Sequence, residues 1–492
     1  MTTTAMMRLR RMAALAAAAA IPLLLLIDDG ARAAEIRVDC SRPAGTIRPL
    51  HGVNNGPLNC GETVDLSAFF REFNPPLTRL HDSEWPNPDV VDIHAIFPDP
   101  AADPERPESY RFARTDDYIR AIVQTGTGIV YRLGESIEHS RRKYHVAPPA
   151  DSGKWAAACL GIIRHYNEGW ADGFRYQIRY WEIWNEPENR PAMWTGSDED
   201  YYRLYAAAAK AIKARYPALR VGGPSVGATG DVVDGRLRPT PFLEGFLKHC
   251  RETGAPLDFF SWHTYTDDPW TYVRKAHAFR RWLDENGFKQ AEVHLNEWNY
   301  LPDNDWAPML MVAPGLKRQQ WYARMGGAEG AAFTACVLAL LQDAPVDVVN
   351  YYTGDSSPFG LFTRDAMPKK TFYTMKAFRM LLDTPQRVEA GGIEAGRGAV
   401  CAGIDAQAGR ATVFVSHFRG ADKAFDLVVD RLPWDGPTAW TVFRLDASRD
   451  LEAESGQAAG APLRIPLALE APAVAVVRLS KVSAAGPAKS AD

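Results

Sequence analysis

The chain has 492 residues, of which 46% are hydrophobic, 24% are charged and 11% are aromatic, and its formal net charge is −4. This composition is typical of a globular protein and excludes a disordered or fibrous chain. Because there is no basic excess that would bind nucleic acid by releasing counterions, no nucleic-acid partner is predicted.

The amino-terminal segment has the pattern of a secretory signal peptide. Three arginines precede an apolar stretch over residues 12–27, and Ala31-Arg32-Ala33 offers small residues to a signal peptidase. The stretch is shorter than a typical membrane span. We therefore predict cleavage near Ala33 and a secreted or periplasmic protein with no stable membrane anchor. The alternative is an uncleaved amino-terminal anchor.

Six cysteines occur in the chain, and none is spaced as C-x-x-C, so neither a zinc site nor a redox motif is predicted. Export would permit disulfides, and Cys40 and Cys60 are the pair that we expect to be bridged. Cys159 and Cys336 lie in apolar helical patterns and are predicted to be buried thiols.

Between about residues 47 and 384, short apolar runs alternate with helical patterns. Near-continuous hydrophobicity is typical of strands that are buried on both faces. The eight predicted strands are 50–54, 77–82, 127–134, 178–185, 219–223, 259–265, 292–298 and 346–352.

Helices separate these strands, with Thr115 and Ser197 as predicted N-caps. The predicted helices are 116–124, 154–166, 198–216, 270–285, 316–341 and 370–382. Alternating strands and helices over this length predict an α/β fold, a (β/α)8 TIM barrel over residues 47–384. An open doubly wound sheet is the competitor, but no Gly-rich phosphate-binding motif follows the first strand.

Helical periodicity ends near Pro385, and residues 385–482 are predicted to form a β-sandwich. The short strand within residues 34–46 precedes the barrel and could join this sandwich. Residues 483–492 are rich in Ala, Ser, Lys and Pro and are predicted to be disordered. The predicted sandwich strands are 400–404, 411–417, 425–429, 439–445, 463–469 and 473–479.

Two glutamates stand where a barrel places its catalytic groups. The fourth predicted strand ends in Trp184-Asn185-Glu186-Pro187 and the seventh ends in Asn296-Glu297-Trp298-Asn299. Catalytic residues of such barrels lie at the carboxyl ends of the strands. Glycoside hydrolysis with retention needs two carboxyl groups about 5–5.5 Å apart. We therefore predict that Glu186 and Glu297 form this pair, against the interpretation that each is a solvated turn residue.

The run Trp181-Glu182-Ile183-Trp184-Asn185-Glu186-Pro187 resembles the acid/base motif of clan A glycoside hydrolases. Within the clan, the chain most resembles family 39, which contains β-xylosidases and α-L-iduronidases. The resemblance covers about residues 47–384, and the family commonly appends a β-sandwich. Supporting segments are Arg79-Leu80-His81-Asp82, His263-Thr264-Tyr265, Phe359-Gly360-Leu361-Phe362 and Pro368-Lys369-Lys370.

The resemblance implies that Glu186 is the general acid/base and that Glu297 is the nucleophile. Asn185 would hydrogen-bond the 2-hydroxyl of the sugar, an interaction that strengthens in the transition state. His263 and Tyr265 would line the subsite of the reacting sugar, and Tyr265 could hold Glu297 ionised.

The two glutamates need opposite surroundings. Arg79 is expected to add positive potential near Glu297 and to keep the pKa of that carboxyl low. The pKa of Glu186 is expected to be raised toward neutral by burial and by the negative charge of Glu297.

Two histidines are open to two interpretations, because His51 and His81 can bind sugar hydroxyls or serve as structural histidines. No pair of histidines at i, i+4 encloses an acid, so no metal and no cofactor is predicted. Trp194, Trp270 and Trp306 lie in predicted βα-loop regions, and one of them is expected to stack on a sugar.

The loops suggest an altered sugar specificity. In the xylosidases of family 39, the loop after the eighth strand carries adjacent acidic residues, whereas residues 351–357 here contain only Asp355. Glu135, at the end of the third predicted strand, could be a replacement carboxylate. Cations in the βα loops are confined to residues 141–143, which is too little to predict iduronidase activity.

The sequence thus predicts a secreted retaining glycosidase that acts in exo mode on β-xylosides or related plant pentosides. Its partner would be an oligosaccharide or a polysaccharide-derived substrate. The alternatives are another glycoside (arabinoside, galactoside or uronide), endo action, a metal-dependent hydrolase, and a catalytically silent carbohydrate-binding protein on the same fold.

Overall fold

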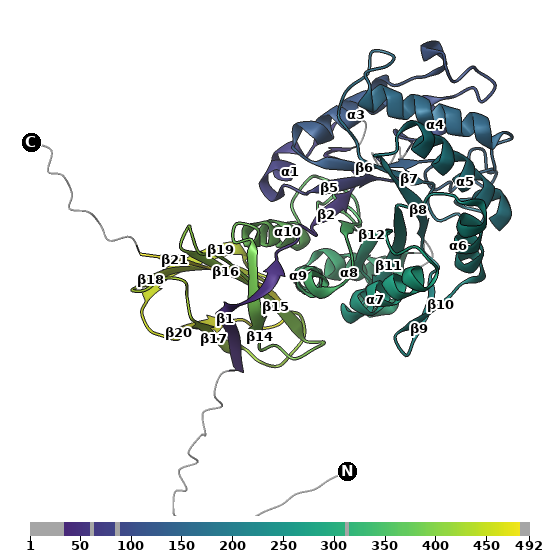
Figure 1. Ribbon diagram of the computed structural model, residues 1–492. Helices are drawn as coiled ribbons and strands as arrows, with labels where there is room; N and C mark the ends of the chain where they lie inside the picture. The colour runs from purple at the N-terminus through teal and green to yellow at the C-terminus, as the bar shows by residue number, and fades with distance from the viewer. Residues whose placement is uncertain (1–33, 60–62, 84–88, 310–313, 483–492) are drawn as a thin grey trace, which may run out of the picture. The chain divides into compact units, whose positions relative to one another are not determined.

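Eight parallel strands close into a barrel in the computed structural model of the protein (Figure 1). Around the barrel they follow the order β11-β12-β13-β2-β5-β6-β7-β8. This closure confirms the predicted (β/α)8 barrel and excludes the open sheet. The strands are β2 (Gly52–Asn54), β5 (Leu77–Leu80), β6 (Gly128–Leu133), β7 (Tyr180–Ile183), β8 (Arg220–Val226), β11 (Phe259–Thr266), β12 (Glu292–Tyr300) and β13 (Val348–Tyr351).

The structure describes residues 34–59, 63–83, 89–309 and 314–482. The predicted signal peptide (1–33), Cys60 of the predicted disulfide and the predicted disordered tail (483–492) lie outside these residues, so those three expectations stay predictions. Cys159 and Cys336 are buried free thiols, as predicted.

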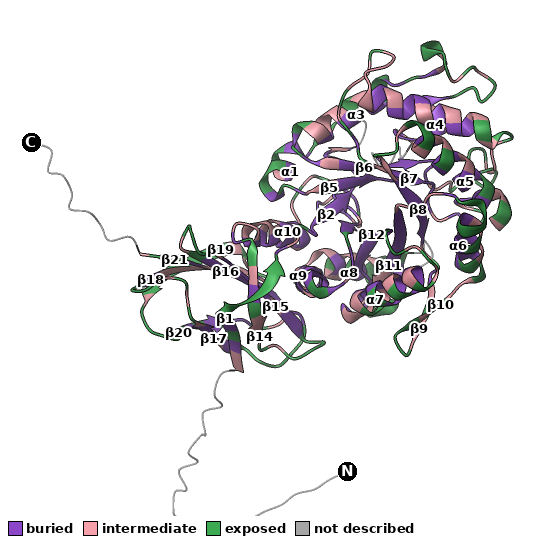
Figure 2. Ribbon diagram, in the orientation of Figure 1, coloured by how far each residue is buried: buried purple, intermediate pink, exposed green. Residues whose placement is uncertain are grey.

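The barrel strands form because they are apolar on both faces. In β12, every residue after Glu292 is buried, and in β6 every residue after Gly128 is buried. Figure 2 shows this burial along the strands of the barrel. A parallel strand that packs against helices on one face and against core side chains on the other has no solvent-exposed face. Its residues therefore do not alternate between polar and apolar, which explains why the apolar runs were recognisable in the sequence.

Helices α1–α10 connect the strands of this domain. Among them, α5 begins at the predicted N-cap Ser197, whose side chain accepts a hydrogen bond from the Asp200 N–H, while the Asp200 side chain accepts one from the Ser197 N–H. The helices are α1 (Ser67–Phe73), α2 (Ile93–Ile96), α3 (Ala113–Gln124), α4 (Ser152–Asn167), α5 (Asp198–Arg215), α6 (Pro241–Thr253), α7 (Trp270–Glu285), α8 (Gly315–Gly326), α9 (Ala328–Leu340) and α10 (Lys370–Leu381).

Short elements lie between the longer ones. They are the two-stranded pairs β3 (Leu58–Asn59) with β4 (Val64–Asp65) and β9 (Gly230–Val233) with β10 (Arg236–Pro239), and the 3-10 helices Pro107–Ser109, Pro302–Asn304, Ala307–Met309 and Leu341–Asp343.

Two helix predictions were wrong in detail. Thr115 does not cap α3, because the helix begins two residues earlier and the Thr115 hydroxyl donates to the Val90 carbonyl. The predicted helix 316–341 is two helices, because Gly327 adopts an extended conformation between α8 and α9. A Cβ at Gly327 would also lie 2.5 Å from the Ala323 carbonyl oxygen.

Helix α6 was missed, although its sequence carries a recognisable start. The Thr240 side chain caps the helix and Pro241 occupies its first turn, which is a favoured combination at helix N-termini. Phe242, Leu243 and Phe246 then form its buried face.

Within the described residues, no single helix combines the length and apolar character needed to cross a membrane. The bent pair α8 and α9, with its 3-10 extension to Asp343, passes that test only as a pair and only by length and composition.

The carboxyl-terminal domain is a nine-stranded β-sheet in the order β19-β18-β21-β16-β15-β14-β1-β17-β20. Alternate apolar side chains of its strands form one buried core. The sheet therefore folds around this core. Its strands are hydrogen-bonded in one continuous order, whereas a β-sandwich would have two separate sheets. The strands after the barrel are β14 (Gln386–Gly391), β15 (Gly398–Asp405), β16 (Arg410–His417), β17 (Ala424–Asp430), β18 (Thr438–Leu445), β19 (Asp450–Ala458), β20 (Leu463–Ala468) and β21 (Ala473–Lys481).

The amino-terminal strand β1 (Ala34–Thr46) lies inside this second sheet. It pairs antiparallel with β14 and parallel with β17. Sequence analysis missed β14 and β19, because each has few buried residues and so no clear apolar alternation: in β14 only Val388 is buried, and in β19 none is.

We predict that Ser197→Ala lowers the free energy of unfolding by about 1 kcal/mol, because the Asp200 N–H in the first turn of α5 loses the Ser197 hydroxyl as its acceptor. The shift of the denaturation midpoint at unchanged slope measures the loss. Ser197→Thr keeps a hydroxyl acceptor and is the matched control. An unchanged midpoint for Ser197→Ala would show that the cap does not stabilise α5.

Candidate active site

Polar side chains from several barrel strands meet at the carboxyl ends of the strands. Glu186 follows β7, His263 and Tyr265 lie in β11, and Glu297 lies in β12. All eight strands are parallel, so their carboxyl ends share one end of the barrel. The fold thus brings together residues that are more than one hundred positions apart.

Glu186 and Glu297 are close neighbours. One oxygen of each carboxyl group and a ring nitrogen of His263 all lie within 4.8 Å of one another. His263 Nδ1 is 2.7 Å from Glu186 Oε1 and 3.6 Å from Glu297 Oε2. Retaining glycosidases hold their carboxyl groups roughly 5–5.5 Å apart and inverting ones roughly 6.5–9.5 Å apart, and carboxyl oxygens within 4.8 Å of each other are compatible with the shorter separation.

Arg79 lies beneath this pair and is fully buried. Its Nε donates to Glu182 at 2.6 Å, and Nη1 lies 3.3 Å from Glu297 Oε2. Burial alone would lower the pKa of Arg79, but the charges of Glu182 and Glu297 raise it above its ordinary value. The further acceptors of its guanidinium are Asn54 Oδ1 (3.1 Å), Asn185 Oδ1 (2.6 Å) and Ser225 Oγ (2.7 Å).

Sequence analysis missed Glu182, Ser225 and Asn296, which complete this network. Glu182 accepts from Asn296 Nδ2 at 2.5 Å, and Asn296 Nδ2 also lies 3.0 Å from Ser225 Oγ. A charged residue between Trp181 and Ile183 in a buried strand was the available signal, because a buried charge needs a partner.

Both oxygens of Glu297 accept hydrogen bonds. The Tyr265 hydroxyl donates to Oε1 at 2.5 Å, and Arg79 donates to Oε2. Burial, together with the charge of Glu297, raises the pKa of Tyr265 well above its usual range, so the phenol stays a donor. These contacts give both oxygens of Glu297 a donor and hold the carboxyl group in one orientation, which a nucleophile needs.

Glu186 has different surroundings. Burial raises the pKa of Glu186. The hydrogen bond and charge of His263, the hydrogen bond from the Asn189 amide at 3.0 Å and the charge of Arg79 together lower it by more, so the pKa lies below its ordinary value. We expected a raised pKa from the sequence. The difference arises because the sequence does not show which donors reach the carboxylate.

The turn after β7 holds Glu186 in an unusual backbone conformation. Trp184 and Glu186 have φ values of 70° and 42°, and left-handed conformations of such residues persist only when their surroundings impose them. The Trp184 indole donates to the Met193 carbonyl at 2.8 Å and packs against Trp194. These contacts anchor the turn.

A second polar group borders the pair. His81 Nε2 lies 3.3 Å from Asp82 Oδ2, and the Tyr352 hydroxyl lies 3.4 Å from the same oxygen. Burial raises the pKa of Asp82 to about 7, and the charge of Glu297 adds to this effect. Asp82 was not singled out in the sequence, although it follows His81 at the end of β5.

Asp355 joins this group from the loop after β13. Its Oδ2 accepts from Asn55 Nδ2 at 3.0 Å, and its Oδ1 is buried with no hydrogen-bond partner in the described part of the chain. A buried carboxylate oxygen without a partner is costly, and a sugar hydroxyl could satisfy it.

The structure does not bring His51 or Glu135 to this group. His51 precedes β2, so it lies at the opposite end of the barrel, where its Nε2 is 3.1 Å from the carbonyl oxygens of Phe73 and Asn74. Both oxygens of Glu135 contact His94, at its backbone N–H and at Nδ1. His51 therefore agrees with the structural interpretation, and Glu135 is not oriented as the replacement carboxylate that the sequence suggested.

The three tryptophans differ in exposure. Trp194 is fully buried, whereas Trp306 is 41% exposed and its ring lies 5.0 Å from that of Tyr265, centroid to centroid. Trp270 begins α7. Trp306 is thus the one of the three with an accessible ring beside a site residue.

Two sets of side chains bring three ligand-type atoms within 4.8 Å in the described residues. They are Glu186 with His263 and Glu297, and Asp92 with His94 and Glu135. In both sets, these side chains already pair with one another or with Arg79 and Arg132. The expectation that the protein uses no metal stays a prediction.

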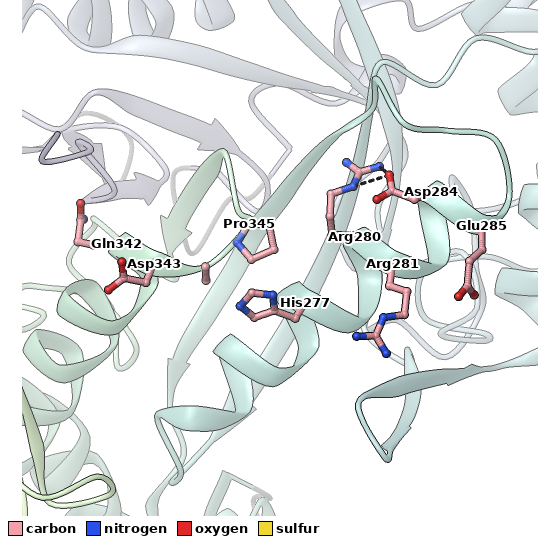
Figure 3. Close-up of a pocket in the computed structure, with 9 residues that line it drawn as sticks. His277, Arg280, Arg281, Asp284, Glu285, Gln342, Asp343 and Pro345 are labelled. Atoms are coloured by element: carbon pink, nitrogen blue, oxygen red, sulfur yellow. Dashed lines mark hydrogen bonds and ion pairs between the residues drawn. The ribbon is translucent and has the colours of Figure 1, made fainter. Parts of the chain in front are cut away.

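A cavity of about 510 Å³ lies elsewhere, between the carboxyl-terminal half of α7 and the segment that leads into β13 (Figure 3). Figure 3 shows His277, Arg281 and Asp343 around it. These segments precede β12 and β13, so the cavity is at the amino-terminal end of the strands, away from Glu186 and Glu297.

Comparisons with known proteins agree with the site. Residues 94–302, which include Glu186, His263 and Glu297, match the family model described as "Glycosyl hydrolases family 39". A beta-xylosidase of Geobacillus stearothermophilus is 26% identical over 269 residues, 49% of each chain. A beta-xylosidase of Caldicellulosiruptor saccharolyticus is 34% identical over 174 residues, 32% of this chain and 33% of that protein. The chain thus matches half or less of the length of these curated relatives.

Solved structures match over nearly the whole chain. A glucosidase of Croceicoccus marinus is 26% identical with a TM-score of 0.76, covering 92% of this chain and 100% of that chain. A family 39 enzyme of Xanthomonas axonopodis pv. citri is 17% identical with a TM-score of 0.67, covering 92% and 98%. The part of the chain that carries the glutamate pair, residues 94–302, thus matches glycoside hydrolase family 39, and the solved structures show that the shared fold extends over nearly the whole chain.

Proposed function

We propose that this protein is a retaining exo-glycosidase that acts on β-xylosides or related pentosides. The observation that carries the proposal is the closeness of the Glu186 and Glu297 carboxyl oxygens at the carboxyl end of the barrel. A gap of this size admits direct attack on a sugar and leaves little room for an intervening water.

In the first step, Glu297 attacks the anomeric carbon while Glu186 gives its proton to the glycosidic oxygen. The bond to the leaving group breaks, and a glycosyl ester forms on Glu297. Arg79 and Tyr265 hold the attacking carboxylate in place by hydrogen bonds.

In the second step, water attacks the anomeric carbon and Glu186 accepts the proton of that water. The ester bond breaks, Glu297 leaves as a carboxylate, and the sugar keeps its anomeric configuration. During this step Glu297 carries no charge, which favours the ionised Glu186 that a base requires.

The sugar and the exo mode are supported by the relatives and by the loops. The curated relatives named beta-xylosidase favour a pentoside. Long loops over residues 137–151 and 301–309 follow β6 and β12, and the second contains Trp306 as a ring for stacking. Export of the protein is part of the proposal and rests on the pattern of residues 1–33.

A glucoside is the second candidate, because the Croceicoccus marinus glucosidase matches 92% of this chain at 26% identity. Xylosides and glucosides differ by one hydroxymethyl group, so a small change in the loops could exchange them. A silent carbohydrate-binding protein is less well supported, because both glutamates and their donors are in place.

We predict that Glu297→Ala lowers turnover on every substrate by on the order of 10⁴-fold or more. Azide should restore turnover of activated substrates and release the glycosyl azide of opposite anomeric configuration, because it enters the space of the lost carboxylate. Product configuration by NMR is the measurement. Rescue with the original configuration would argue against Glu297 as the nucleophile.

We predict that Glu186→Ala slows alkyl glycosides by roughly 10²–10⁴-fold. Dinitrophenyl glycosides should lose far less, because their leaving groups depart without protonation. The dependence of kcat/KM on leaving-group pKa measures the difference. Equal losses on both classes would count against Glu186 as the acid.

We predict that a panel of nitrophenyl glycosides gives the highest kcat/KM on a β-xyloside or an arabinoside. Residues 352–357, which follow β13, contain only one acidic residue, Asp355. Losing one charged hydrogen-bond partner costs about 1.5–3 kcal/mol, or roughly ten- to hundred-fold in selectivity, so the preferred pentoside can differ from xylose. The Glu297→Ala protein, purified in parallel, controls for contaminating activity. Activity confined to hexosides or uronides would contradict the pentoside assignment and leave the glutamate roles intact.

A further inference from the structure

Glu188 is a carboxylate that the mechanism above does not use, two residues after Glu186. Its Oε1 accepts hydrogen bonds from the backbone N–H groups of Gly227 at 2.7 Å and Ala228 at 2.9 Å. Its Oε2 is inaccessible to solvent and has no hydrogen-bond partner in the described residues. Such an arrangement ties the loop after β8 to the turn after β7 and leaves one buried oxygen unsatisfied.

The same loop also contacts Glu186. A Cβ at Gly227 would lie 2.5 Å from Glu186 Oε1 and 3.5 Å from Glu188 Oε1. Both carboxyl groups therefore face Gly227, and only a residue without a side chain leaves room for Glu186. Glu188 thus holds the loop close to Glu186 by two hydrogen bonds. The absence of a side chain at Gly227 leaves room for the Glu186 carboxyl group.

We propose that Glu188 is a positioning residue that holds the loop after β8 against Glu186 and acts on the reaction through that carboxyl group. This inference rests on the proposed function, because it assigns Glu188 a role through the acid/base of that reaction. No direct contact between Glu188 and the sugar is required.

The electrostatics agree with the geometry. Burial, followed by the charge of Glu186, raises the pKa of Glu188 to about 7. The coupling is reciprocal, so an ionised Glu188 raises the pKa of Glu186. Between the two apparent pKa values the pair holds one proton, which keeps a fraction of Glu186 protonated at higher pH than its donors alone would allow.

Other charged or titratable groups face Glu186 and Glu188 from the neighbouring elements. All of them contribute to the pH dependence of kcat/KM. His263 and Arg79 oppose the effect of Glu188, because they lower the pKa of Glu186. The groups are Arg79 on β5, His263 and Tyr265 on β11, Glu297 on β12 and Tyr201 on α5.

The test is the pH profile of kcat/KM for Glu188→Gln on a glycoside with a poor leaving group. The amide oxygen still accepts from Gly227 and Ala228, so the loop should stay in place, but the shared proton is lost. We expect the alkaline limb to move to lower pH by roughly one unit or more, with the acid limb unchanged. Glu188→Asp, which keeps the charge, should move the limb less.

Asp446→Asn is the matched control, because Asp446 also accepts two backbone N–H groups, from Ser448 and Arg449, but lies in the carboxyl-terminal sheet domain. It should leave the profile unchanged. In a Glu186→Ala background, Glu188→Gln should have no effect on the alkaline limb.

An unchanged profile for Glu188→Gln in an active enzyme would overturn the inference and leave the proposed function standing. An equal shift in the Glu186→Ala background would also overturn it, since Glu188 would then act independently of Glu186. A wild-type protein that cleaves no glycoside on the panel would overturn the proposed function, and the inference with it.

Discussion

The buried guanidinium of Arg79 is the interaction on which the site depends. It joins β5 to side chains at the ends of β2, β7, β8 and β12, and it is fully shielded from solvent. A buried ion pair that loses one partner typically costs about 3–5 kcal/mol. The positions of Glu182, Asn185 and Glu297 are therefore set together, and the barrel cannot shift one strand end without disturbing the others.

Two identical side chains acquire different roles from their surroundings. Glu297 receives donors on both oxygens, from Tyr265 and Arg79, which fix the orientation of its carboxyl group. Glu186 is more accessible and contacts His263, whose pKa is lowered by burial but raised above its ordinary value by the charges of Glu297 and Glu186. Because Glu188 also lies nearby, the protonation of Glu186 depends on both His263 and Glu188. This dependence suits a group that must both give and take a proton.

The glutamate pair and the carboxylates beside it come from different parts of the chain. The family match spans residues 94–302 and includes the glutamate pair. Asp82 and Asp355, the carboxylates beside that pair, lie outside it, in segments that follow β5 and β13. Substitutions in such loops leave the barrel intact, so the reaction can persist while the preferred glycoside changes.

The sequence alone determined the barrel and predicted which two glutamates lie together at its carboxyl end, because buried parallel strands are continuously apolar and strand ends are local features. It could not show that His94 occupies both oxygens of Glu135, or that His263, 77 positions away, would reach Glu186 and lower its pKa. Only the tertiary structure decided these points. Hydrogen bonds and charges act over a few ångströms. Only the folding of the chain into the closed barrel determines which side chains far apart in the sequence come within that range.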